Sequence, residues 1–326
     1  MHMNPDVTLE AVREAHERIK GFIHRTPLMR SGSLNALMSA DIVFKCENLQ
    51  RAGVFKARGA FNTVYSLTDA EAIRGVVTSS SGNQAAALSL AASSRGIPAY
   101  IAMPKVALKS KVNAVRRYGG NIVWVESKGA VPTSEEYEAT AARIQDETRA
   151  NPVHPYNDRR TIAGQGTCAL EIIDERKNLD FVLAPVGGGG LLAGVSLVFK
   201  ALGANTRVIG CEPEMADDAC RSLRAGNIVP QRDPRTIADG LRTSLGDLTF
   251  SLISHNVDDI VTVSEEAIIG AMRLIWETLK ILIEPSSAVA VAAALERKIP
   301  LSGKTVAIIL SGGNVDLDNL PWRANQ

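Results

Sequence analysis

FVLAPVGGGGLLAGVSLVFKAL, residues 181–202, runs from a short apolar segment through four consecutive glycines into a longer apolar segment. The first segment is typical of a buried strand, and the second is long enough for a buried helix. Four glycines let consecutive backbone N–H groups face one anion at the positive end of that helix. The pattern indicates a phosphate site at the carboxyl end of a strand, with a flexible tight turn as the alternative.

Strands, loops and helices alternate on both sides of this stretch. The predicted strands are short apolar runs at 41–46, 75–78, 99–104, 121–125, 207–211, 259–263 and 305–310. The predicted helices lie at 8–23, 84–94, 108–118, 134–150, 191–202 and 265–281. This order predicts an α/β fold with two open, twisted, mainly parallel sheets and helices on both faces. Because active sites in such sheets lie at the carboxyl ends of the strands, we expect the site residues in the loops at those ends.

Composition argues against several classes of protein. The 326 residues carry a net charge of +1 with no long run of either sign, so we expect no nucleic-acid or membrane partner. No apolar run reaches the length of a membrane span, and the first residues lack a signal-peptide pattern, so we expect a cytoplasmic protein. The four cysteines form no CxxC pair and the five histidines no HxxxH pair, which disfavours disulfides and zinc.

A lysine at a predicted helix start is a candidate for catalysis. Lys56 ends the run Gly53-Val54-Phe55-Lys56, where a strand-like stretch gives way to a helix. The positive helix end and the apolar neighbours disfavour the ammonium form, so we expect a lowered pKa. A lowered pKa suits an amine that acts as a nucleophile or base. A solvated lysine on a surface helix is the alternative.

Two further loops end predicted strands in small polar residues. Residues 79–83, Ser-Ser-Ser-Gly-Asn, present hydroxyls, a carboxamide and N–H groups at a helix start, which suits a carboxylate or a ring oxygen. Residues 311–314, Ser-Gly-Gly-Asn, place a hydroxyl that can face a ring nitrogen without forcing its protonation. The simpler interpretations are a serine helix cap and an ordinary turn.

A dinucleotide-binding site is the competing interpretation of the glycine stretch. Gly188, Gly190 and Ala193 satisfy G-x-G-x-x-A, and Glu212 lies near the position of a ribose-binding carboxylate. An NAD-dependent oxidoreductase would follow. The motif lies mid-chain rather than at a first strand, and this interpretation leaves Lys56 and the serine loops unexplained.

Taken together, the loops resemble those of fold-type II pyridoxal-phosphate enzymes, which have a tryptophan synthase β-like fold. The resemblance covers about residues 10–320, is closest to the serine/threonine dehydratase and serine racemase branch, and preserves the order of four motifs. It implies pyridoxal 5'-phosphate as cofactor and assembly as a homodimer. It also implies a large cofactor-binding domain, residues 1–70 and 152–326, and a small mobile domain, residues 71–151, that closes over the substrate.

The resemblance assigns cofactor roles residue by residue. Lys56 matches the lysine that forms a Schiff base with the cofactor, and Phe55 matches the residue packed against its ring. Asn83 matches the partner of the ring's phenolic oxygen, and Ser311 the partner of the ring nitrogen. The phosphate cradle matches Gly187, Gly188, Gly189 and Gly190.

The resemblance also implies a substrate site and an activity. Ser81 matches the hydroxyl facing the substrate Cα opposite the lysine, and the substrate carboxylate pocket matches Ser80, Ser81, Asn83 and Gln84. The implied reaction is β-elimination from a β-hydroxy amino acid such as L-threonine or L-serine, giving a 2-oxo acid and ammonia. The alternatives within the family are 3-hydroxyaspartate dehydratase and a serine or aspartate-like racemase.

One acidic stretch also matches the family, and two residues differ from the family's usual pattern. Glu212, the Ala216 carbonyl and Asp218 match a divalent-cation site for Mg2+ or Ca2+, or else form a solvated acidic loop. Val54 stands where the family usually has serine, which removes a hydroxyl near the cofactor. Gln84 stands where histidine often follows Ser-Ser-Gly-Asn, which leaves the substrate preference open.

Overall fold

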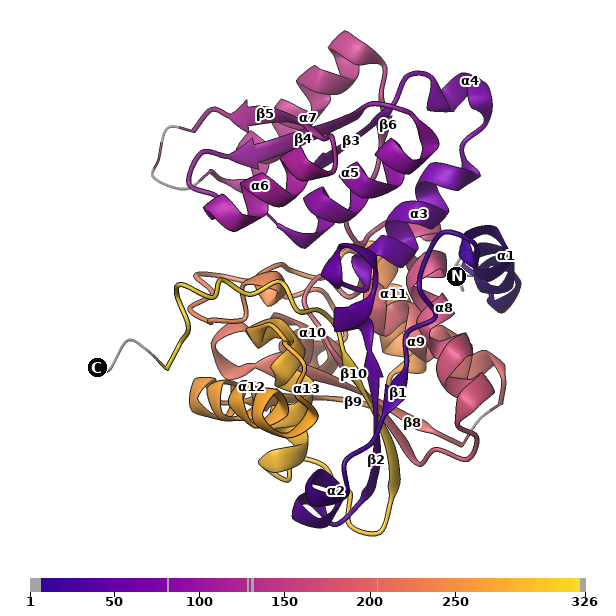
Figure 1. Ribbon diagram of the computed structural model, residues 1–326, viewed down its shortest axis with the longest axis vertical. Coiled ribbons are helices and arrows are strands. Elements are labelled where there is room, and N and C mark those ends of the chain that lie inside the picture. The colour runs from indigo at the N-terminus through magenta and orange to yellow at the C-terminus, as the bar shows by residue number, and fades with distance from the viewer. Residues whose placement is uncertain (1–6, 81, 128, 130–131, 204, 323–326) are drawn as a thin grey trace.

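The larger of two sheets forms the base of the molecule (Figure 1). The computed structural model describes residues 7–80, 82–127, 129, 132–203 and 205–322. The strand order is β1-β2-β10-β7-β8-β9, and β1 pairs antiparallel with β2 while the other neighbours are parallel. The bounds are β1 (Leu28–Met29), β2 (Asp41–Cys46), β7 (Phe181–Pro185), β8 (Arg207–Pro213), β9 (Asp259–Val263) and β10 (Thr305–Leu310).

The smaller sheet is parallel throughout its described strands and has the order β5-β4-β3-β6. Its strands are β3 (Val76–Ser79), β4 (Ala99–Pro104), β5 (Asn121–Val125) and β6 (Asn151–Pro152). These two sheets confirm the predicted α/β fold. The described strands of the smaller sheet lie between residues 76 and 152, and the division into domains of 71–151 and of 1–70 with 152–326 stays a prediction.

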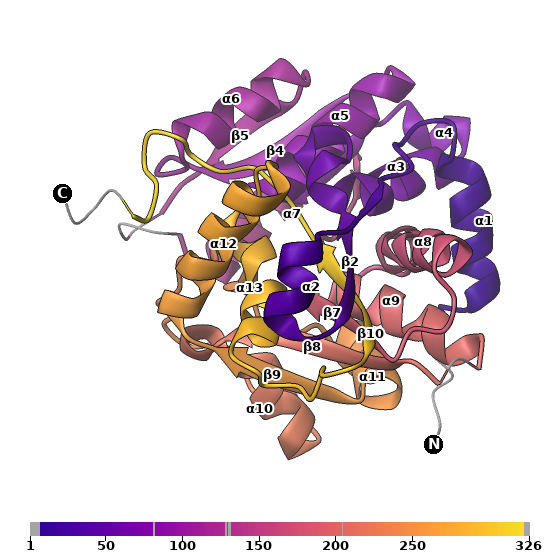
Figure 2. The same ribbon diagram turned by 60° about the horizontal axis from the view of Figure 1, so that its bottom comes forward.

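Helices cover both faces of the larger sheet (Figure 2). One face carries α2 (Gly32–Met38), α12 (Glu265–Leu279) and α13 (Pro285–Leu295), and the other carries α1 (Leu9–Ile19), α8 (Arg159–Glu175), α9 (Gly190–Ala201) and α11 (Asp247–Asn256). Neighbouring residues of a strand point to opposite faces, so Ile308 joins the first core and Ile309 the second. Within the described parts of the chain, no helix is long and apolar enough to cross a membrane.

The helices around the smaller sheet connect it to the larger one. Its two cores contain residues of α5 (Asn83–Arg95) and α6 (Lys109–Arg117) on one face, and of α7 (Ser134–Thr148) on the other. Helix α3 (Lys56–Ser66) packs against both α5 and α8. The shorter elements are α4 (Asp69–Ala72), α10 (Asp218–Ala225), η1 (Glu47–Leu49), η2 (Arg51–Gly53), η3 (Glu214–Ala216) and η4 (Asp239–Leu241).

Several predicted boundaries differ from the structure. The helix predicted over 8–23 ends at Ile19, because Lys20 caps it and Gly21 begins a turn. The strand predicted over 207–211 continues to Pro213, which pairs with Val263 of β9. Two long helices, α8 and α13, were not among the predicted elements at all.

A buried group of four charges fixes α3 to β2 and α8. Arg58 donates to Glu47 Oε2 at 2.7 Å and to Glu171 Oε1 at 2.7 Å, and Lys45 donates to Glu171 Oε2 at 2.6 Å. The side chains of Arg58, Lys45 and Glu47 are fully buried. Because Arg58 lies two residues after Lys56, this group also fixes the start of α3.

Candidate active site

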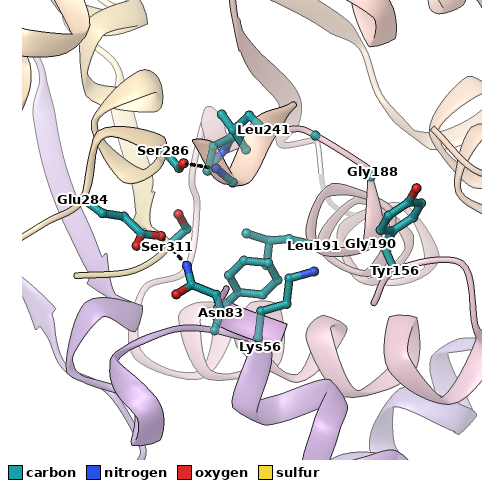
Figure 3. A pocket seen from close by; sticks show the side chains of 15 residues that line it. Lys56, Asn83, Tyr156, Gly188, Gly190, Leu191, Leu241, Glu284, Ser286 and Ser311 are labelled. Atoms are coloured by element: carbon teal, nitrogen blue, oxygen red, sulfur yellow. Dashed lines mark hydrogen bonds between the residues drawn. The ribbon is translucent and has the colours of Figure 1, made fainter. Parts of the chain in front are cut away.

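Four helices begin and two strands end around one pocket (Figure 3). The helices are α3, α5, α9 and α13, and the strands are β7 and β10. Helix starts carry unpaired N–H groups and a positive dipole end, so this arrangement favours a bound anion. The pocket is lined by Phe55, Lys56, Asn83, Tyr156, Pro185, Gly187, Gly188, Gly189, Gly190, Leu191, Gly240, Leu241, Glu284, Ser286 and Ser311.

The structure brings every predicted cofactor-binding residue to this pocket. Figure 3 shows Asn83, Glu284 and Ser311 on one side and Gly188, Gly190 and Tyr156 on the other, with Lys56 between them. The motifs that contain these residues are more than 250 positions apart at their ends, and the sheet's topology joins them. What each residue binds stays a prediction.

Lys56 is the first residue of α3, as the sequence predicts. Its Nζ donates a 2.6 Å hydrogen bond to the Pro155 carbonyl oxygen and lies 5.2 Å from the centre of the Phe55 ring. The side chain is partly buried, and loss of contact with water lowers the pKa of Lys56 to about 8. A much larger fraction of this amine than of an ordinary lysine is therefore neutral near physiological pH.

The tetraglycine turn has no room for side chains. Gly189 has φ +88°, and a Cβ atom on Gly188 would lie 2.3 Å from the Tyr156 ring. Gly189 also precedes the first residue of α9 and supplies no side-chain cap, so the first-turn N–H groups are left for another acceptor. A turn in which side chains would clash, but whose backbone N–H groups can bind an anion, suits a phosphate-binding site.

The Asn83 carboxamide is held from two sides. Its Nδ2 donates to Glu284 Oε1 at 2.8 Å, and its Oδ1 accepts a 2.9 Å hydrogen bond from Asn314 Nδ2. The same Asn314 Nδ2 lies 2.9 Å from the Ala52 carbonyl oxygen. The network therefore joins the lysine loop, the serine loop and the Ser-Gly-Gly-Asn loop.

Ser311 and Val54 lie where the lysine loop meets the end of β10. Ser311 is buried, and its carbonyl oxygen accepts a 2.9 Å hydrogen bond from the Phe55 N–H. Val54 forms a bridge with Gly312 and is also buried. Valine at this position therefore contributes apolar packing against the turn, where a serine would bring a hydroxyl.

Of the residues predicted to bind the substrate, the structure brings only some to the pocket. Ser81 lies outside the described residues. Ser80 Oγ accepts a 3.2 Å hydrogen bond from the Gly82 N–H, which stabilises the turn before α5. Gln84 is 3% exposed, and neither of its polar side-chain atoms has a hydrogen-bond partner among the described residues. Asn83 lines the pocket, but Ser80 and Gln84 are not among the lining residues.

Sequence reasoning missed several residues of the pocket wall. Tyr156 lies in the loop before α8, Glu284 is the N-cap of α13, and Ser286 lies in the first turn of α13; none of them belongs to a predicted motif. Ser286 Oγ accepts a 3.0 Å hydrogen bond from the Gly240 N–H. Glu284 had one available signal: it directly precedes Pro285, the first residue of α13, and an acidic residue there suggests a helix start. That signal predicts a cap and not a place in the site.

The predicted cation residues lie together, outside the pocket lining. Glu212 is buried, and its two carboxylate oxygens accept the N–H groups of Ala219 at 3.0 Å and Cys220 at 2.9 Å. Asp218 is also buried, and neither of its carboxylate oxygens has a hydrogen-bond partner among the described residues. Burial raises the pKa of Glu212 to about 9 and that of Asp218 to about 7. Within the described residues, no group of three or more His, Cys, Asp or Glu side chains is arranged to hold a metal.

The sequence and the fold have counterparts among known proteins. A family model described as pyridoxal-phosphate dependent enzyme matches residues 19–312. The chain belongs to this family. It is 50% identical to β-hydroxyaspartate dehydratase from Paracoccus denitrificans (strain Pd 1222), over 97% of this chain and 98% of the relative. It is 48% identical to serine racemase from Arabidopsis thaliana, over 95% and 94%. The structure of maize serine racemase matches with a TM-score of 0.93 and 44% identity, over 98% and 96%.

Membership confirms the resemblance to fold-type II enzymes and a dependence on pyridoxal phosphate. The residues present fit that group, because the pocket combines a neutralisable amine, Lys56, with a glycine turn that a Cβ would fill. The nicotinamide alternative is wrong for this family. Glu212, the carboxylate it required, is buried and already accepts two backbone N–H groups.

Proposed function

We propose that this pyridoxal-phosphate enzyme removes water from a β-hydroxy amino acid and releases a 2-oxo acid and ammonia. The observation that supports it most is the Lys56 amine. It lies in the pocket, its pKa is lowered to about 8, and its described hydrogen bond goes to a carbonyl oxygen and not to a carboxylate. Such an amine can accept a proton at neutral pH, which is what elimination at Cα requires.

In the proposed mechanism, Lys56 removes the proton from the substrate Cα. Bound pyridoxal phosphate supplies the electron sink that makes this proton acidic. The Gly187–Gly190 turn would hold the cofactor phosphate, and Ser311 and Asn83 would hold its ring. Departure of the β-hydroxyl gives an enamine, which tautomerises and hydrolyses in water to the 2-oxo acid and ammonia.

Two relatives support the candidate reactions. The dehydratase from Paracoccus denitrificans is named for β-hydroxyaspartate, which supports the 3-hydroxyaspartate alternative beside L-serine and L-threonine. The serine racemase from Arabidopsis thaliana, at 48% identity, supports the second candidate function, in which Cα is reprotonated from the opposite face. We propose Ser81 for that proton, as the resemblance implies. A homodimer, a cytoplasmic location and closure of the 71–151 domain complete the proposal on the same basis.

A substrate panel tests the proposed reaction. We expect the purified enzyme with pyridoxal phosphate to release equal amounts of 2-oxo acid and ammonia from at least one of L-serine, L-threonine and 3-hydroxyaspartate. Chiral chromatography of the remaining amino acid reports racemisation in the same samples. Accumulation of the D-enantiomer without release of 2-oxo acid would contradict the dehydratase function and support the racemase function.

We also propose that Glu212, the Ala216 carbonyl and Asp218 hold a divalent cation. Two buried carboxylates, one of them without a hydrogen-bond partner among the described residues, are costly to keep charged without a counter-ion. Carboxylate and carbonyl oxygens are ligands that suit Mg2+ or Ca2+. Two carboxylates and one carbonyl leave the remaining ligand positions to water.

Thermal denaturation tests the cation site. Because a ligand that binds only the folded state stabilises it, we expect Mg2+ or Ca2+ to raise the melting temperature of the metal-free protein. The Asp218→Asn variant removes one charge with little change of shape and should lose most of that shift. An equal shift in Asp218→Asn and in the unsubstituted protein would rule the site out.

A further inference from the structure

Glu284 occupies an unusual place for an acidic residue at a helix start. It is the N-cap of α13, yet its side chain makes no capping hydrogen bond. Its carboxylate instead lines the cofactor pocket and accepts the Asn83 Nδ2 at 2.8 Å, from a residue 201 positions away. The residue is 4% exposed, so its carboxyl group has little contact with water and is held by the Asn83 amide instead of capping the helix.

Two neighbours define the orientation of the Asn83 amide. Glu284 in its ionised form can only accept, so it marks the amide end of Asn83 that carries the N–H groups. Asn314 Nδ2 donates to the other end, Asn83 Oδ1, at 2.9 Å. The carboxamide oxygen and one N–H are thereby engaged, and one N–H of Asn83 remains for a partner in the pocket.

We infer that Glu284, together with Asn314, is a positioning residue that turns the free N–H of Asn83 toward the ring oxygen of the cofactor. This inference rests on the cofactor site of the proposed function but not on the identity of the substrate. Glu284 acts through Asn83 and need not touch the substrate. The Asn83 amide has two ends of nearly equal shape, so without this carboxylate only the hydrogen bond from Asn314 favours the orientation that donates to the pocket.

The backbone around Glu284 is built to keep it in place. Its N–H donates to the Gly312 carbonyl oxygen at 3.0 Å. A Cβ atom on Gly312 would lie 2.6 Å from Glu284 Oε1, so a glycine is needed for the carboxylate to pass between the turn and Asn83. The Ser-Gly-Gly-Asn loop therefore serves the cofactor site twice, through Ser311 and through the room it leaves for Glu284.

The orientation imposed by Glu284 should depend on pH. Burial, and secondarily the charge of Asp239 on η4, raise the pKa of Glu284 to about 7, while Asn83, Lys111 on α6 and the Asn314 backbone act in the opposite direction. Lys56 on α3 is a further charged group of the same pocket. The carboxylate is ionised above this pKa and protonated below it. A protonated carboxyl can donate, so the preference for one Asn83 orientation is present above about pH 7 and lost as the pH falls.

The test compares Glu284→Gln, Glu284→Ala and the matched control Glu296→Gln at the other end of α13. Glu296 accepts a hydrogen bond from Ser264 and does not line the pocket. We expect Glu284→Ala to weaken pyridoxal-phosphate binding about tenfold or more, as loss of a buried charged partner does. The near-visible absorbance of the bound cofactor should change with pH near 7 in the unsubstituted protein and in Glu296→Gln, and this transition should be absent in Glu284→Gln.

Three readouts make the outcome decisive. The inference is overturned if Glu284→Gln shows the same pH transition as the unsubstituted protein, or if Glu284→Ala binds the cofactor equally well. It is also overturned if the variants lose only thermal stability in the cofactor-free form, because that would be a purely structural role. Should the unsubstituted protein bind no pyridoxal phosphate, the proposed function itself fails, which separates the two failures.

Discussion

Replacing Lys56 with alanine is expected to lower kcat for 2-oxo acid release by about 10²–10⁴-fold or more, the usual contribution of a positioned base. The Lys56 amine is the pocket's partly buried basic group, with a pKa lowered to about 8. Alanine leaves α3 intact because it favours helices. The measurement is 2-oxo acid release at saturating substrate and pyridoxal phosphate.

Lys105 provides the control for this substitution. It lies just beyond β4, its side chain is 63% exposed, and it forms an ion pair with the exposed Glu126 at 3.3 Å. We expect Lys105→Ala to keep nearly full activity. A Lys56→Ala enzyme with more than a tenth of the original kcat would show that the proton is removed by another group.

The Glu171→Gln substitution is expected to lower the free energy of unfolding by about 3–5 kcal/mol, because it removes the negative charge of a buried ion pair and leaves the positive charge in place. The Glu171 carboxylate accepts hydrogen bonds from Arg58 and Lys45, whose side chains are both fully buried. Without this carboxylate charge, one of the two buried cations has no counter-charge. Loss of stability this large should be visible as a lowered midpoint in urea or thermal unfolding.

An exposed pair of the same chemistry gives the comparison. Arg273 and Glu277 lie one turn apart on α12 at 2.8 Å, with both side chains 59% exposed. Such pairs contribute about 0.3–0.5 kcal/mol, so Glu277→Gln should change stability by about that amount. Equal effects of Glu171→Gln and Glu277→Gln would contradict the structural role of the buried group.

Much of the fold could be predicted because its signals are local. The strand, glycine turn and helix at 181–202 follow one another directly, and the predicted strand at 305–310 has the same bounds as β10. Helices α8 and α13 were missed because the middle of α8 and most of α13 are buried, so neither shows a clear polar face along its length. Burial on all sides removes the periodicity by which a helix is recognised.

The site residues also fall into two groups: those that a local motif predicts and those that only the tertiary structure brings to the pocket. Lys56, the glycines and Ser311 each sit in a short motif whose residue types suit one kind of bond. Glu284 and Tyr156 belong to the pocket only because segments far apart in the chain meet there: Glu284 bonds Asn83, and the Tyr156 ring closes over Gly188. Contacts across such separations are set by tertiary packing, which a local pattern does not encode.

Borohydride reduction followed by peptide mass analysis tests the central claim most directly, namely that Lys56 carries the pyridoxal phosphate of this enzyme. We predict that the protein loaded with cofactor absorbs in the near-visible and that reduction bleaches this absorbance. Digestion should then place the phosphopyridoxyl group on the peptide containing Lys56. A colourless protein after saturation with pyridoxal phosphate, or a label on a different lysine, would contradict the account.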